Sequence, residues 1–117
     1  MKIPEKIKIG NREVKIELVN LTEFGLHGQY DPETYIISIN SEDSRMAQIE
    51  TLWHEIIHAV HDYNETMTSI ANEIAASQMD GGDPEIRAYN LEEQMTQGFS
   101  SIFLQVIKDN KLLNLTE

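Results

Sequence analysis

The chain of 117 residues has no cysteine, few basic residues and no long apolar run. Without cysteine there is neither a disulfide framework nor a thiolate zinc site, so any bound zinc ion must take His, Asp or Glu ligands. Only 9 Lys and Arg stand against 20 Asp and Glu, and the net charge of −11 argues against nucleic acid or an anionic membrane as a partner. No stretch approaches the roughly 18 apolar residues that cross a membrane, and the N-terminus lacks the apolar segment of a signal peptide. We therefore expect a cytoplasmic protein.

The most informative stretch is the pentapeptide 54–58, which reads His-Glu-Ile-Ile-His, an HExxH motif. Residues four apart lie about 40° apart around an α-helix and about 6 Å apart along it, so His54 and His58 can bind one metal ion. Glu55 can then reach a water at the open position of the metal and act as general base toward that metal-activated water. The motif predicts a zinc-dependent metallopeptidase with Glu55 as its catalytic residue.

The sequence around the motif has the periodicity of an amphipathic helix. Ser44 is a candidate N-cap, and the predicted helix runs from there to about Tyr63. A second helix is predicted at about 66–79, and a last helix, after the breaker at 80–84, ends near Lys108. Apolar residues recur in the first helix at spacings of three and four: Met46, Ile49, Trp53, Ile56 and Val60.

The first forty residues carry strand signals instead. Lys6–Ile9 and Val14–Leu18 alternate apolar and polar residues on either side of a short hairpin signal at 10–12. Gly28–Tyr30 and Tyr35–Ile39 form a second pair around the turn-favouring residues 31–34. This order predicts an α+β fold in one domain, 1–117, with an N-terminal antiparallel sheet of three to four strands packed on the HExxH helix and a long C-terminal helix. Either strand of the second pair could be an edge along which an extended substrate pairs.

A catalytic zinc ion usually takes three protein ligands, so a third must join the two histidines. His61 continues their helix face, but one straight helix rarely places three side chains around one ion. Glu73, on the predicted second helix, is more typical of a solvated charge. Glu92 and Glu93 open the last helix, which could cross the motif helix, although acidic residues there also suit the helix dipole. The residues alone leave His61, Glu92 and Glu93 open as the third ligand.

Several segments beyond the motif carry a resemblance to a known group. They are the start at 3–10, the strand pair at Gly28, the ending at 105–110, and a helix in which Glu93 is followed by Thr96, Gln97, Phe99 and Ser100. The chain resembles the gluzincins and, more closely, small phage and prophage HExxH proteins related to the ImmA/IrrE-like and SprT-like metallopeptidases. The resemblance spans most of the chain. It implies a minimal zincin-like fold, a Zn²⁺ ion held by His54, His58 and Glu93, and a peptide or protein substrate.

Other side chains are candidates for supporting roles. His61, Tyr63 and Tyr89 could donate a hydrogen bond to the oxyanion of the reaction. Asp62, four residues after His58, could orient an imidazole ring. The alternative to an enzyme is a catalytically silent metal-binding interaction module of phage origin. The residue types do not separate zinc from manganese or iron outright, but two imidazoles and a carboxylate suit zinc.

Overall fold

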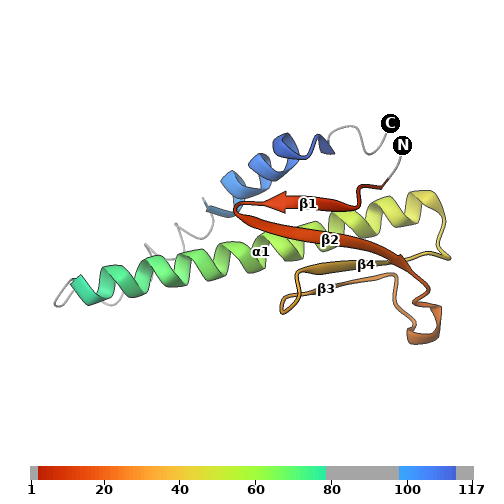
Figure 1. Cartoon of the computed structure of the whole chain (residues 1–117), viewed down its shortest axis with the longest axis horizontal. Coiled ribbons are helices and arrows are strands. Elements are labelled where there is room, and N and C mark those ends of the chain that lie inside the picture. Colours follow the sequence, from red (N-terminus) through yellow and green to blue (C-terminus); the bar gives the residue numbers. More distant parts are fainter. Residues whose placement is uncertain (1–2, 79–97, 113–117) are drawn as a thin grey trace.

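A computed structural model describes residues 3–78 and 98–112 and shows a four-stranded sheet packed against two helices (Figure 1). The described elements therefore confirm the α+β class. Residues 98–109 form the C-terminal helix. The other elements, in chain order, are β1 (Lys6–Ile9), β2 (Arg12–Val19), the 3₁₀-helix η1 (Thr22–Phe24), β3 (Gly28–Asp31), β4 (Ile36–Asn40) and α1 (Arg45–Gln78).

The strands lie in the order β1-β2-β4-β3. Both predicted hairpins are present, because β1 pairs antiparallel with β2, and β3 pairs antiparallel with β4. The strands β2 and β4 run parallel, so the sheet is mixed and the expectation of a purely antiparallel sheet was wrong at this pairing. Burial explains the arrangement: Ile37 and Ile39 of β4 are fully buried and suit a central strand, whereas the more polar β3 suits an edge.

Both helices cover one face of the sheet. The inward residues of the strands meet a buried stripe on α1 and Val106 of the C-terminal helix, whereas the outer face carries polar pairs such as Lys6–Glu13. The buried stripe includes Leu52, while Trp53 is half-buried at its side and packs against Phe103 with ring centroids 6.2 Å apart. The core thus comprises Ile7, Ile9, Val14, Ile16, Ile37, Ile39, Ile49, Leu52, Ile56, Ala59, Val60 and Val106, among others.

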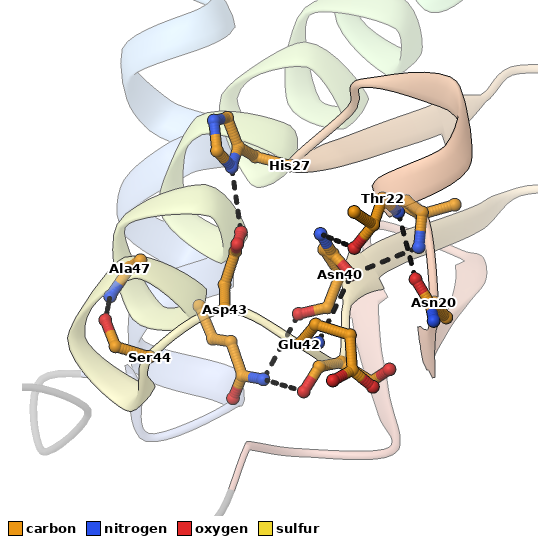
Figure 2. Close-up of polar contacts among 11 residues, drawn as sticks. Asn20, Thr22, His27, Asn40, Glu42, Asp43, Ser44 and Ala47 are labelled. Carbon is orange, nitrogen blue, oxygen red and sulfur yellow. Dashed lines mark hydrogen bonds and ion pairs between the residues drawn. The ribbon is translucent and has the colours of Figure 1, made fainter.

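The helix that carries the motif continues without a break to Gln78, so the predicted division into two helices near 64–65 was wrong. The segment 45–78 contains no glycine or proline that would end it. The Thr66 hydroxyl donates to the Asp62 carbonyl (3.0 Å), so this polar side chain is accommodated within the helix. At the start of α1, the Ala47 N–H donates to the Ser44 hydroxyl (3.2 Å), which confirms the predicted N-cap (Figure 2).

The C-terminal helix ends as predicted, near Lys108, whereas its predicted start lies outside the described residues. Its end is tied to the sheet by Asn110, whose side chain accepts from the Lys8 N–H (2.8 Å) and donates to the Lys8 carbonyl (2.9 Å). No helix in the described part of the chain is long and apolar enough to span a membrane. The domain boundary, 1–117, stays a prediction.

Candidate functional site

The two histidines of the motif converge on the exposed side of α1. The Nε2 atoms of His54 and His58 lie 3.1 Å apart, and the rings meet edge to face with centroids 4.7 Å apart. Glu55, between them in sequence, is buried, with 7% of its surface exposed. One helical turn therefore presents two imidazole nitrogens to solvent beside a glutamate side chain that the fold encloses.

The spacing of the two nitrogens suits a shared metal ion. Two nitrogens bound at 2.0–2.1 Å to a tetrahedral ion stand about 3.3 Å apart, which is close to the separation of His54 Nε2 and His58 Nε2. Both rings are exposed, so an ion can reach them from solvent. The donor set of this chain therefore fits a metal such as zinc.

The third ligand is not found among the residues that the structure describes. Within 3–78 and 98–112, no group of three His, Cys, Asp or Glu side chains could hold a metal ion. His61 instead packs its ring against Phe99, with centroids 5.2 Å apart. Glu73 lies fifteen residues beyond His58 on the same helix, about 22 Å along the axis. Glu92 and Glu93 lie outside the described residues, so Glu93 as a ligand stays a prediction.

The C-terminal helix packs across the motif helix. In the sequence, this arrangement was the reason for considering Glu92 and Glu93 as the third ligand. Besides the His61–Phe99 contact, the crossing is close enough at Gly98 that a Cβ there would lie 2.5 Å from the Asn64 side-chain oxygen. Phe99 stacks in turn on Phe103, with centroids 5.8 Å apart. The last described helix therefore approaches α1 within two turns of His58.

Two hollows lie on either side of Glu55, between α1 and the edge strand β3. One, of about 530 Å³, is lined by the segment 25–28 and by α1 residues that include Glu50, Thr51 and His54. The other, of about 510 Å³, is lined by residues of β3 and its turn and by His58, His61, Asp62 and Glu65. Glu55 lines both hollows. The candidate base thus lies between two hollows along the edge strand, which we together call the groove.

The wall of the first hollow is braced by polar contacts that Figure 2 shows. His27 Nδ1 lies 2.8 Å from Asp43 Oδ2, which joins the loop before β3 to the start of α1. The buried Asn40 accepts from the Leu21 N–H (3.1 Å), and its carbonyl accepts from the Gln48 amide (3.2 Å). These contacts fix the loop 20–27 against the first turn of α1. Sequence reasoning missed His27, because nothing local signals a partner sixteen residues away.

At the second hollow, Asp62 has other partners than the imidazole expected from the sequence. Its Oδ2 accepts hydrogen bonds from Arg12 Nη1 and from the Tyr30 hydroxyl, both at 2.9 Å. The Arg12 guanidinium lies over the rings of Tyr35 (4.1 Å) and Tyr63 (5.2 Å). Burial, followed by the hydrogen bond to Asp62, raises the pKa of Tyr30 to about 12. Tyr30 therefore lines the groove as a neutral phenol.

The proposed oxyanion donors fall in different places. His61 lines the second hollow beside His58, and its role as a donor stays a prediction. Tyr63 packs under the β1–β2 turn, where a Cβ on Gly10 would overlap its hydroxyl. Tyr89 lies outside the described residues. Tyr30, which the sequence reasoning used only as part of a strand, is the tyrosine that borders the groove.

Comparison with known proteins gives one match. Residues 11–95 match the family model of the IrrE N-terminal-like domain, peptidase family M78. No curated protein and no solved structure matches the chain. The matched segment contains the strands β2, β3 and β4, the histidine pair and the groove, whereas β1 lies before it.

Proposed function

Since the chain belongs to the IrrE N-terminal-like domain family, an ImmA/IrrE-like metallopeptidase family, we propose that it is a zinc-dependent peptidase of the gluzincin type with Glu55 as general base. Membership suggests metallopeptidase activity and implies a metal cofactor and protein substrates. The observation that supports the finer proposal is the convergence of His54 and His58 beside the enclosed Glu55.

In this proposal His54, His58 and Glu93 hold the metal, with both imidazoles neutral. When bound, the ion supplies Lewis-acid chemistry, which lowers the pKa of water and polarises a carbonyl. The approach of the C-terminal helix to α1 at Phe99 supports a ligand from the segment before it.

Glu55 handles the proton of the reaction. Its carboxylate accepts a proton from the attacking water as the water oxygen bonds to the peptide carbonyl carbon. The same proton then passes to the departing amine nitrogen as the C–N bond breaks. The low exposure of Glu55 holds its side chain in place for both transfers and limits competition from bulk water.

The substrate is an extended polypeptide segment that pairs with β3. This strand is at the end of the sheet order, and its outer edge has no strand partner among residues 3–78 and 98–112. A segment added there receives backbone hydrogen bonds, and its side chains on either side of the cleaved bond enter the two hollows.

The substitution Glu55→Gln tests the assignment of the base. We expect peptide hydrolysis to fall by at least about 100-fold while the metal content stays at the wild-type level, because the amide cannot accept the proton. Glu73→Gln is the matched control, since Glu73 is exposed on the same helix and lines neither hollow. Activity retained in a folded, metal-loaded Glu55→Gln variant would falsify the assignment.

The third ligand is tested by metal analysis of three single variants, His61→Ala, Glu92→Gln and Glu93→Gln. We expect only Glu93→Gln to reduce zinc affinity severely, measured by competition with a chromophoric chelator. Severe loss in His61→Ala or Glu92→Gln instead would reassign the ligand. Full zinc binding by the wild type without cleavage in a broad peptide library would support the silent metal-binding module.

A further inference from the structure

The edge strand passes unusually close to the motif helix at Gly28. A Cβ placed on this residue would lie 2.3 Å from Thr51 Cγ2, 3.0 Å from the Ser38 carbonyl oxygen and 3.4 Å from Glu55 Cγ. The distance to Thr51 Cγ2 is far below van der Waals contact. The distance to the Ser38 carbonyl oxygen leaves little room for the new Cβ to move toward β4. The gap between β3 and α1 is therefore closed by the backbone of Gly28 itself.

Position 28 requires a glycine because neighbouring atoms leave no room for a side chain, and not because of its backbone conformation. Gly10 and Gly25 have φ values of 61° and 67°, in the left-handed region that favours glycine. Gly28 lies in regular antiparallel pairing with Ile39 and has no positive φ. The backbone conformation at position 28 allows an alanine, so only the steric overlap with neighbouring atoms disfavours this substitution.

The crowded neighbours are parts of the candidate site. Thr51 lines the first hollow, and Glu55 lines both. The β3 backbone at Gly28 covers the Glu55 side chain, which accounts in part for its low exposure. The distance from β3 to α1 thus sets how far a segment paired on β3 stands from the Glu55 carboxylate.

We propose that Gly28 is a positioning residue, which holds the edge strand at the distance from α1 that aligns a bound peptide with Glu55. This inference rests on the proposed function and adds a determinant outside the HExxH motif. It acts on the reaction step more than on binding, because a peptide can still pair with a displaced strand while its carbonyl no longer meets the base.

A double-mutant cycle between positions 28 and 51 tests the proposal. Gly28→Ala should lower kcat about 10- to 100-fold with KM within about threefold, because small misplacements cost catalysis steeply. Thr51→Ser removes the crowding methyl and keeps the hydroxyl, and its own effect on kcat is measured as the second single variant of the cycle. Added to Gly28→Ala, it should recover kcat at least fivefold. Glu33→Ala is the control, since Glu33 follows β3 in the chain, is exposed and lines neither hollow.

Thr51→Ile provides a second route if Gly28→Ala does not fold, because it narrows the same gap from the helix side. It too should lower kcat more than it changes KM. Full kcat in a folded Gly28→Ala or Thr51→Ile variant would overturn the proposal, as would a loss in Gly28→Ala that Thr51→Ser does not relieve.

A metal-free measurement separates this proposal from the proposed function. In the apo-protein, Gly28→Ala should lower the thermal midpoint by several degrees, and Thr51→Ser should recover part of that loss. If the wild type cleaves no peptide, the proposed function fails, and the same cycle is then measured on the affinity of the zinc-loaded protein for a peptidyl hydroxamate. A hydroxamate, unlike a substrate in its ground state, must meet the metal and Glu55 together, so Gly28→Ala should weaken its affinity about tenfold. An unchanged affinity would overturn the positioning role of Gly28.

Discussion

Arg12, Asp62 and Tyr30 form a polar cluster beside the groove. Asp62 Oδ2 accepts from both of the others, and the Arg12 side chain is only 9% exposed, held over two aromatic rings. The cluster joins the β1–β2 hairpin, the edge strand and α1 at one oxygen atom. These contacts among three elements therefore hold the wall of the second hollow in place.

The pKa of Tyr30 gives a prediction for alkaline pH. Burial and Asp62 raise this pKa from 10.0 to about 12, so the folded protein favours the neutral phenol. Its contribution to stability is complete below about pH 10 and is lost as the pH rises from about 10 to 12. A spectrophotometric phenolate titration should show a step near pH 12 that Tyr30→Phe removes.

Asp62→Asn is the informative companion variant in that titration. It removes the charge and weakens the acceptor, so the pKa of Tyr30 should move down toward 10, although burial keeps it from returning fully. An unchanged step near pH 12 in this variant would show that Asp62 does not contribute.

At the scale of single residues, the sequence predicted the spatial relations between residues that are close to one another in the chain. His54, Glu55 and His58 lie within one helical turn, so their relation follows from helix geometry alone. The partners of Asp62 lie 50 and 32 residues away and are set by the tertiary fold, which no local pattern encodes. For the same reason Tyr30 and Gly28 were visible in the sequence only as strand residues.

At the scale of elements, the two sides of the motif helix show how burial divides neighbouring positions. Ile56 is fully buried against the sheet, whereas Ile57, the next residue, is 42% exposed. The same turn thus supplies the core on one side and the proposed metal ligands on the other. The direction in which the site residues point depends on the core residues of α1, because these residues set the rotation of the helix on the sheet.

This division predicts different costs for two similar substitutions. Ile56→Ala should destabilise the protein by about 2–5 kcal/mol through lost burial and a cavity. Ile57→Ala should cost less than about 1 kcal/mol, because solvent fills the vacated space. Urea unfolding followed by circular dichroism measures both, and equal costs would contradict the packing of α1.

Element boundaries and pairings were predicted unevenly. Alternation and turn residues identified all four strands, and Ser44 identified the start of α1. The break expected near 64–65 was absent, because Asn64 is buried and Thr66 bonds back to the helix. The parallel pairing of β2 with β4 was missed, since it depends on where the loop 20–27 places β3, and not on either strand alone.

At the scale of the whole molecule, Asn110 joins the two ends of the described chain. Its side chain bonds both the N–H and the carbonyl of Lys8, 102 residues earlier, and its amide also donates to the Val106 carbonyl (2.9 Å). These contacts occupy part of the β1 edge in the way that a neighbouring strand would. The C-terminal helix is thereby held over the sheet.

Removal of this contact should loosen the whole fold. Asn110→Ala removes the part-buried bond to the Val106 carbonyl and both bonds to Lys8, where water can replace the side chain, so we expect a loss of about 1 kcal/mol in the free energy of unfolding. Gln105→Ala is the control, because it removes only an exposed hydrogen bond to Asp109 and should stay within about 0.5 kcal/mol. Thermal unfolding of both variants measures the difference.

The outer edge of β3, which has no strand partner among residues 3–78 and 98–112, also has a consequence for the behaviour of the protein at high concentration. A strand edge that can accept one extended segment can accept another copy of itself, which is the usual start of aggregation in sheet proteins. This edge is only four residues long, and it belongs to a chain with a net charge of −11, so copies repel one another before they meet. High salt or acid, which weaken that repulsion, should therefore promote self-association.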